Sequence, residues 1–418
     1  MNSNLPGREE FNNARPLIMH IDLNSCFATI EQQSRPLLRG EPVGIVNRRT
    51  DKTSLVTASY EAKARGVKVG MRLSEAKQLC PNLIALESDP EKYRYIYHRL
   101  LAIMQDYSAH VTMKSIDEGV IDFTQASQAV LARSLEDIGM EIKQRLRCEV
   151  GVWMRCNIGI STNRFLAKTA ASLHKPDGLD VITPENIKDV LKSLKLTDLT
   201  GIASRNQRRL NSVGIYTPLQ FLNADPITLH RVVFKSVVGE WWYKRLRGFE
   251  VDDVTTQIGR VGRQYVLDRF DLSYDEVIQR LHYLCESVGG RMRRQKLGAR
   301  GVFVYVKTYQ RKYWHASSLS PLPFFSDQAI FNQASQLFTT CPNVADAREI
   351  GIHCYELAPI DTPQQSLFAD QIMQERQVVL AIDDINKRFG ERTIHSASTL
   401  QASPSLRARI PFGSTRYL

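Results

Sequence analysis

The sequence contains three acidic residues whose types and spacing could support chemistry. Asp117 and Glu118 are adjacent within an apolar run at 115–123, and Asp22 lies in another apolar run at 17–23. Carboxylates are seldom buried unless they are paired or bind a metal. Two neighbouring strands that bring acids to the same end would form a site of hard oxygen ligands, which Mg²⁺ prefers. In a basic chain, such a site indicates phosphoryl chemistry on nucleic acid.

The charge and cysteine content narrow the class of protein. The 418 residues include 55 Lys and Arg against 44 Asp and Glu, a formal net charge of +11. This excess favours a polyanionic partner such as nucleic acid, although a merely soluble basic protein would also show it. The seven cysteines are odd in number and lack CxxC spacing, which argues against a disulfide framework or a zinc site. No segment is typical of a signal peptide or a membrane span, so we expect a cytoplasmic protein with no membrane partner.

Alternating strands and helices must position the acids, which argues for an α/β core in the first part of the chain. In the first part, residues 16–28 are predicted to be a strand that runs into a turn, and the other predicted strands are 41–47, 55–58, 115–123 and 157–160. The predicted helices of this part are 60–65, 91–108, 128–147 and 163–173. Short helical patterns without strands follow over 187–250. A further unit from 258 to about 360 has predicted strands at 261–267 and 301–308 around a helix at 274–295. A last helix at 370–388 could bind a partner or the chain itself.

Several motifs resemble those of one enzyme family. The segment His-Ile-Asp-Leu-Asn-Ser-Cys-Phe-Ala at 20–28 resembles the first palm motif of Y-family, lesion-bypass DNA polymerases. Ser-Ile-Asp-Glu at 115–118 is similar to the second acidic motif of that family. The segments 157–168 and 175–178 are similar to its third conserved block, and the motifs occur in the family's order. The bacterial DNA polymerase IV and UmuC-like branches are the most similar types.

The resemblance implies an α+β multidomain fold, a right-hand polymerase with palm, small fingers, helical thumb and a separate little-finger domain. The expected domains are an N-terminal extension at 1–15, a palm at 16–32 and 91–185, fingers at 33–90, a thumb at 186–252, a little finger at 258–360, and a clamp-binding linker, helix and tail at 361–418. The implied activity is template-directed translesion DNA synthesis of low fidelity on primer-template DNA.

The resemblance also implies roles for the acids. Asp22, Asp117 and Glu118 would be the catalytic residues and, with the backbone carbonyl of Leu23, the ligands of two Mg²⁺ ions, for which Mn²⁺ could substitute. Phe27 occupies the steric-gate position, where an aromatic ring excludes a ribose 2′-hydroxyl.

The deoxynucleoside triphosphate would be bound by Thr57, Tyr60, Lys63 and Lys175. The chain departs from its relatives at four positions. Cys26 stands where many have an aromatic residue, Asn24 replaces a common Asp with little expected effect, Lys63 replaces Arg, and Ala203 replaces the second glycine of a helix-hairpin-helix element.

Further residues are expected to bind DNA and a sliding clamp. The expected DNA contacts are Gly201, Arg208, Arg260, Arg263, Lys307 and Arg311. Gln-Gln-Ser-Leu-Phe at 364–368 resembles the bacterial clamp-binding pentapeptide, with Gln364, Ser366, Leu367 and Phe368 as its contacts. We expect a monomer that associates with the bacterial nucleoid when active.

Two alternatives remain open from the sequence. A non-catalytic adaptor that binds DNA and the clamp would be favoured by the loss of one of the three acids. A metal-dependent nuclease would need neither Phe27 nor residues that bind a triphosphate.

Overall fold

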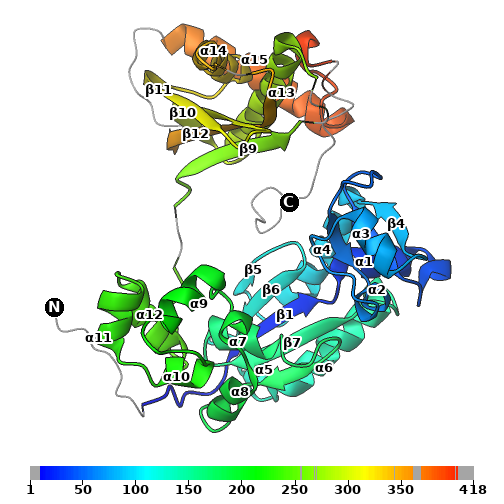
Figure 1. The fold of residues 1–418 in the computed structure, drawn as a ribbon, viewed down its shortest axis with the longest axis vertical. Helices are drawn as coiled ribbons and strands as arrows, with labels where there is room; N and C mark the ends of the chain where they lie inside the picture. The colour runs from blue at the N-terminus through cyan, green and yellow to red at the C-terminus, as the bar shows by residue number, and fades with distance from the viewer. Residues whose placement is uncertain are drawn as a thin grey trace. The chain divides into compact units, whose positions relative to one another are not determined.

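The computed structural model describes residues 10–254, 257–267, 269, 271–342, 344–360, 369–400 and 402, without the side chains of 369–373. The described residues form two compact units, one up to Val254 and one from 257 to 402 (Figure 1). Within the described part of the chain, no helix is long and apolar enough to span a membrane.

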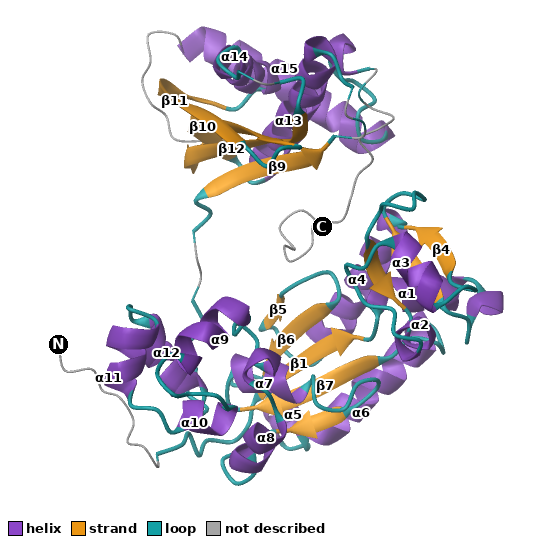
Figure 2. Cartoon of the chain, viewed as in Figure 1, coloured by secondary structure: helices purple, strands orange, loops and turns teal. Residues whose placement is uncertain are grey.

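A five-stranded sheet lies at the centre of the first unit (Figure 2). Its order is β5-β6-β1-β7-β8, and its strands are β5 (Val111–Met113), β6 (Glu118–Asp122), β1 (Ile18–Leu23), β7 (Cys156–Ser161) and β8 (Leu179–Val181). The central strand β1 is antiparallel to both neighbours, β6 and β7. Apolar residues alternate on β1, so Met19 and Ile21 point to one face and Ile18 to the other.

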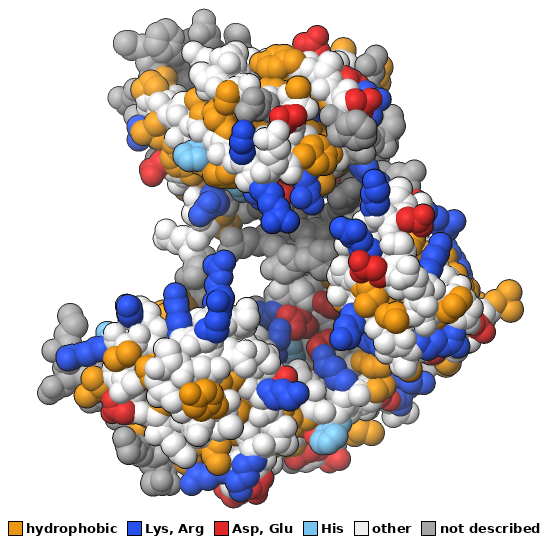
Figure 3. Space-filling view, viewed as in Figure 1, with side chains coloured by type: hydrophobic (Ala, Val, Ile, Leu, Met, Phe, Trp, Pro, Cys, Tyr) orange, Lys and Arg blue, Asp and Glu red, His pale blue; other side chains and the backbone are white. Residues whose placement is uncertain are grey.

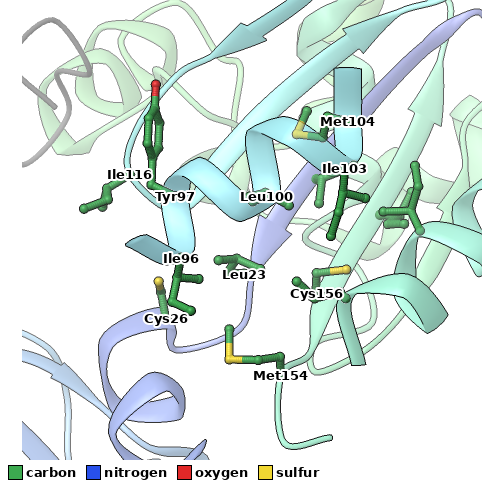
Figure 4. Packing of buried hydrophobic residues seen from close by; sticks show 14 of the residues in the cluster. Leu23, Cys26, Ile96, Tyr97, Leu100, Ile103, Met104, Ile116, Met154 and Cys156 are labelled. Carbon is green, nitrogen blue, oxygen red and sulfur yellow. The ribbon is translucent and has the colours of Figure 1, made fainter. Parts of the chain in front are cut away.

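Helices cover both faces of this sheet. On one face lie α4 (Pro90–Gln105) and α6 (Leu135–Arg145), and Ile96, Leu100 and Ile103 of α4 join the core around β1 (Figure 4). On the other face, α7 (Arg164–Ala170) approaches β7 closely. The approach requires Gly159, because a Cβ there would lie 2.0 Å from the carbonyl oxygen of Ala167.

A smaller sheet of order β3-β2-β4 packs on short helices and connects to the acids through α1 (Cys26–Ser34). Its elements are β2 (Val43–Val46), β3 (Leu55–Ala58), β4 (Ile84–Glu87), α2 (Tyr60–Ala64) and α3 (Leu73–Leu79). The rest of the first unit is helical around a core that includes Phe165, Phe221 and Trp242. Those helices are α8 (Ile187–Ser193), α9 (Ser204–Asn211), α10 (Pro218–Leu222), α11 (Pro226–Thr228) and α12 (Val238–Arg245).

The second unit is an antiparallel sheet of order β11-β10-β12-β9, with helices on one side (Figure 1). Its elements are β9 (Arg260–Val266), α13 (Tyr274–Arg294), β10 (Leu297–Thr308), β11 (Tyr313–Phe324), α14 (Asp327–Phe338), β12 (Ala347–Pro359) and α15 (Ala369–Phe389). Arg293 is only 5% exposed and forms ion pairs with Asp327 of α14 and Asp383 of α15. The helix expected at 370–388 therefore packs on this unit.

The strand expected to run into a turn over 16–28 ends at Leu23, and the backbone turns at Ser25, whose φ is 45°, before α1 begins at Cys26. Two other sequence-based boundaries need correction. The helix expected over 128–147 is divided into α5 (Gln128–Leu131) and α6, since the Ser134 side chain accepts a hydrogen bond from the backbone N–H of Asp137 and caps a new helix. The acidic strand expected over 115–123 begins at Glu118, after a turn.

Candidate active site

The three acids lie at one edge of the five-stranded sheet. Asp22 and Glu118 are directly opposite each other in the β1–β6 pairing. The backbone N–H of Leu23 donates to the carbonyl oxygen of Asp117 over 2.8 Å, which holds the turn before β6 against the end of β1. The expectation that two neighbouring strands bring acids to the same end is confirmed, and antiparallel pairing is its cause.

A pocket of about 260 Å³ opens beside these acids. It is lined by Asp22, Leu23, Asn24, Ser25, Cys26, Phe27, Val56, Thr57, Tyr60, Lys63, Val69, Asp117 and Lys175. The structure thus brings all four expected triphosphate-binding residues, the expected gate and two of the acids to one cavity. Acidic and basic side chains lie side by side in the middle of this unit (Figure 3).

Two lysines and a histidine pair with the acids. Lys175 Nζ forms an ion pair with Asp22 Oδ2. Lys168 Nζ lies 2.8 Å and 2.6 Å from the two carboxylate oxygens of Glu118, and Nε2 of the buried His20 lies 3.2 Å from Oε2. Burial alone would raise the pKa of Glu118, but hydrogen bonds from His20 and Lys168 hold it at about 2. Glu118 is therefore ionised at neutral pH.

Asp117 is in a different environment. Burial raises its pKa, a hydrogen bond from Ser115 opposes that rise, and the negative charges of Asp22 and Glu118 add to it. Close carboxylates that raise one another's pKa are stabilised in their ionised form by a cation between them. The oxygen donors of Asp22, Asp117 and the Leu23 carbonyl therefore suit a divalent metal ion.

Glu118 is the exception within this donor set. Among the described residues, no group of three or more His, Cys, Asp or Glu side chains is arranged to hold a metal ion. The ion pair with Lys168 and the contact with His20 occupy both oxygens of the Glu118 carboxylate. Glu118 would have to exchange these contacts to bind a metal.

Phe27 forms one wall of the pocket at the start of α1. Its ring is 4% exposed and stacks on Tyr93 of α4, with centroids 4.3 Å apart and planes 8° from parallel. The hydroxyl of Tyr93 lies 3.1 Å from Oε1 of the buried Glu31, which fixes the stacking partner. The neighbouring Cys26 is also buried, and burial raises the pKa of its thiol, so a neutral side chain lies at this end of the pocket.

The smaller sheet contributes the other wall. Thr57 lies on β3, and Tyr60 and Lys63 lie on α2. Lys63 Nζ donates to Ser25 Oγ over 2.7 Å and lies 4.7 Å from the Tyr60 ring centroid. Burial and the positive charge of Lys175 lower the pKa of Lys63, so two cations are concentrated in this pocket.

Asn24 has a larger role than its sequence context indicated. It is 2% exposed, and its Nδ2 donates to Asn157 Oδ1 on β7 over 2.8 Å. Its Oδ1 accepts a hydrogen bond of 2.8 Å from the backbone N–H of Asp177, beside Lys175. A carboxylate could not donate to Asn157, so the hydrogen bond to β7 depends on the amide of Asn24, whereas the bond from Asp177 needs only an acceptor oxygen.

Sequence reasoning also gave no role to His20, Ser25 and Lys168. The strand period gave a signal for His20, because residues 20 and 22 point to the same face of β1. Lys168 lies on α7, and its pairing with Glu118 depends on the close approach of α7 to β7.

The expected DNA-binding residues lie in different environments. Gly201 has a φ of +96° in the turn before α9, and Arg208 is exposed on α9. In the second unit, Arg260 and Arg311 are exposed, and Lys307 forms an ion pair of 2.7 Å with Glu349. Arg263 instead packs toward α13, where its guanidinium lies 5.1 Å from the Tyr283 ring centroid. The residues expected to bind a clamp, Gln364, Ser366, Leu367 and Phe368, lie outside the described residues.

Comparisons with known proteins identify the family. The impB/mucB/samB family matches residues 21–172, and the C-terminal domain of that family matches residues 261–367. The chain is 30% identical over 398 residues to DNA polymerase IV of Pelotomaculum thermopropionicum, covering 94% of this chain and 97% of that protein. It is 31% identical over 392 residues to DNA polymerase IV of Moorella thermoacetica, with 92% and 96% covered. The chain belongs to the Y-family DNA polymerases.

Solved structures show that this Y-family chain has the family's fold. A chimeric Y-family DNA polymerase built from Dbh and Dpo4 superposes with a TM-score of 0.66 at 20% identity, covering 81% of this chain and 98% of that chain. An insertion ternary complex of Dbh DNA polymerase gives a TM-score of 0.56 at 21% identity, with the same coverage. Membership of the Y-family, together with the DNA polymerase IV relatives, assigns this chain DNA-directed DNA synthesis of the translesion type, and the family implies dependence on a divalent metal.

Proposed function

We propose that this polymerase adds deoxynucleotides to a primer 3′-end through a two-metal site formed by Asp22, Asp117, Glu118 and the carbonyl of Leu23. The observation that carries the proposal is the convergence of Asp22, Asp117, Phe27 and Lys175 on one pocket. When bound, two Mg²⁺ ions would activate the primer hydroxyl and stabilise charge on the leaving group, and Mn²⁺ could replace them.

The chain's own residues would bind and orient the nucleotide. Lys63 and Lys175 supply positive charge toward the triphosphate, and Thr57 and Tyr60 add hydroxyl donors. Lys175 now pairs with Asp22, so triphosphate and metal would together separate this ion pair, each taking one partner. The ring of Phe27, fixed by its stack on Tyr93, would exclude a ribose 2′-hydroxyl by contact.

The domain assignment is part of the proposal. The five-stranded sheet and its helices would be the palm, the smaller sheet the fingers, α8 to α12 the thumb, and the second unit the little finger. Gly201 and Arg208 would contact DNA from the thumb, and Arg260, Lys307 and Arg311 from the little finger. Arg263, which packs toward α13, would support that surface through β9. Low fidelity would follow from small fingers that leave the new base pair open.

The partners proposed are primer-template DNA, a deoxynucleoside triphosphate and a sliding clamp, for a polymerase that acts as a monomer. Binding through residues 364–368 would raise the local concentration of an enzyme that dissociates readily from DNA.

Primer extension on damaged and undamaged templates tests the function. Changing Asp117 and Glu118 together to Ala should abolish extension, while binding to primer-template DNA survives. Asp189→Ala is a matched control, since this carboxylate on α8 is 77% exposed and pairs across its own helix turn with Lys192. Extension by the Asp117/Glu118 variant at the control's rate would refute the two-metal assignment. It would leave the non-catalytic adaptor without support as well.

A further inference from the structure

Several aromatic side chains lie on the side of the second unit's sheet that α13 and α14 do not cover. Helices α13 and α14 cover one side, where Val302, Val304 and Val306 of β10 are fully buried. The intervening residues point to the other side and, with their partners on neighbouring strands, form what we call the aromatic face. It consists of Phe303, Tyr305, Tyr313, His315, His353 and Tyr355.

Five rings of the aromatic face, those of Phe303, Tyr305, Tyr313, His315 and His353, form one continuous cluster. Phe303 lies 5.3 Å from His315 with planes 22° apart, and Tyr305 lies 5.9 Å from His353 with planes 19° apart, between ring centroids. Tyr313 lies 5.7 Å from Tyr305 and 5.5 Å from His315. Rings from three neighbouring strands thus form a surface of contiguous aromatic contacts.

Glycines beneath the rings let them lie flat. A Cβ at Gly301 would lie 2.3 Å from the Tyr355 ring, and one at Gly351 would lie 2.2 Å from the Tyr305 ring. These two rings therefore pack on glycine backbone with no side chain beneath them, and Tyr305 itself is only 4% exposed. The outermost ring, Tyr313, remains 54% exposed on the edge strand β11.

Charge around the aromatic face fits a polyanion. Arg260 is exposed and pairs in register with Tyr355, and Arg311 and Lys312 are exposed at the turn into β11. The acid on this face, Glu349, forms an ion pair with Lys307 and lies 2.9 Å from the Tyr305 hydroxyl. Figure 3 shows Lys and Arg side chains along the sheet side of this unit. Burial and the charge of Arg260 lower the pKa of His353, which keeps its imidazole uncharged at neutral pH.

We propose that the aromatic face binds unpaired bases of single-stranded DNA by stacking. Paired bases in a duplex already stack on each other and offer only their edges, whereas an unpaired base can place its face on an aromatic ring. Flat rings with a cationic rim are the combination that holds single strands without sequence preference. The inference rests on the proposed DNA polymerase function, in which the unpaired template strand is the available ligand. It adds base stacking to the phosphate contacts proposed for this unit.

Binding of single strands with and without bases tests the proposal. The full chain would be titrated with fluorescent twelve-nucleotide oligothymidine and with an abasic oligonucleotide of equal length and charge, at one salt concentration. Because a stacked base contributes about 1–3 kcal/mol, we expect oligothymidine to bind about tenfold or more tightly than the abasic strand. The double variant Tyr313→Ala/His315→Ala should bring this ratio close to one without weakening abasic binding.

Three further variants separate stacking from other causes. Tyr274→Ala removes a tyrosine of similar exposure, 45%, from the helical side of the same unit and should leave the ratio unchanged. Tyr313→Leu/His315→Leu keeps apolar bulk on the edge strand but removes the rings, so it should lose the preference while remaining folded. Lys312→Ala should weaken both strands equally.

Three results would overturn the inference. The intact chain could bind oligothymidine and the abasic strand with equal affinity, or both double variants could keep the ratio of these affinities unchanged. The third is a double variant that loses as much affinity for duplex DNA as for oligothymidine. A change in sedimentation with an unchanged ratio would identify the face as a contact between copies of the chain and would also refute it. Primer extension on an undamaged primer-template reads the polymerase function separately, through the Asp117 and Glu118 variants.

Discussion

Truncation of Phe27 should have two effects of separate origin, one on sugar selection and one on stability. The ring is 4% exposed and stacks on Tyr93 at 4.3 Å, so Phe27→Ala leaves a cavity and removes the stacking partner of Tyr93. Loss of a buried Phe side chain costs about 3–5 kcal/mol, which includes the share of about 0.5–1.5 kcal/mol that comes from stacking. For a unit of this size, that corresponds to a fall in melting temperature of about 6–20 °C.

Two measurements keep these effects apart. Thermal unfolding of the full chain gives the change in the first unit's transition. Single-nucleotide incorporation at a temperature where the variant is folded gives kcat/KM for a ribonucleotide and for the matching deoxynucleotide. We expect the ratio to move toward the ribonucleotide, because the pocket wall that would meet a 2′-hydroxyl has been removed.

Two further variants serve as controls. Tyr93→Phe keeps the stacked ring and removes the hydroxyl beside Glu31, so it should lower stability without opening the pocket. Phe27→Leu keeps most of the apolar volume but not the planar ring. Unchanged sugar selection in folded Phe27→Ala would refute the gate assignment. A melting temperature within a degree or two of the parent would refute the stacking argument.

Three other changes should have measurable outcomes. Arg293→Met should destabilise the second unit by about 3–5 kcal/mol in denaturant, because it leaves Asp327 and Asp383 without their shared cation; unchanged stability would contradict this. Gly159→Ala should destabilise the first unit by about 1–3 kcal/mol or more and impair primer extension, because the added Cβ meets the backbone of α7. Gly259→Ala should have neither effect, because a Cβ at that position would have no neighbouring atom within 4 Å. Burial lowers the pKa of His282 below its usual value of 6.5, so the unfolded chain binds the proton more readily than the folded chain. The second unit should therefore lose stability as the pH falls below about 6.5. In melting experiments at several pH values, His282→Phe should make the melting temperature depend less on pH.

Local sequence patterns predicted much of the secondary structure of the first unit and much of the candidate site. The apolar runs at 17–23 and 115–123 predicted neighbouring strands, and β1 and β6 are neighbours with Asp22 opposite Glu118. The helix expected at 274–295 differs from α13 by one residue, because Ser273 and Glu276 cap its start reciprocally.

Long-range contacts account for what the sequence did not reveal. The pairing of Lys168 with Glu118 joins residues 50 positions apart, and no local period encodes it. The role of Asn24 also depends on partners more than a hundred residues away, Asn157 and Asp177. The strands β11 and β12 had no prediction, and β11 has one side open to solvent, with rings rather than the usual polar residues.

The packing of α15 on the second unit bears on where a minimal version of this enzyme could end. A shortened chain that stops after β12, near residue 360, would look complete from the sheet alone. It would remove Asp383 from Arg293 and Arg392 from Glu286, and it would uncover the surface now shielded by Thr399, which is fully buried. Truncation at that point would therefore take an ion-pair partner from two charged residues of α13 and shorten the folded core, so the smallest stable fragment should extend to at least residue 402.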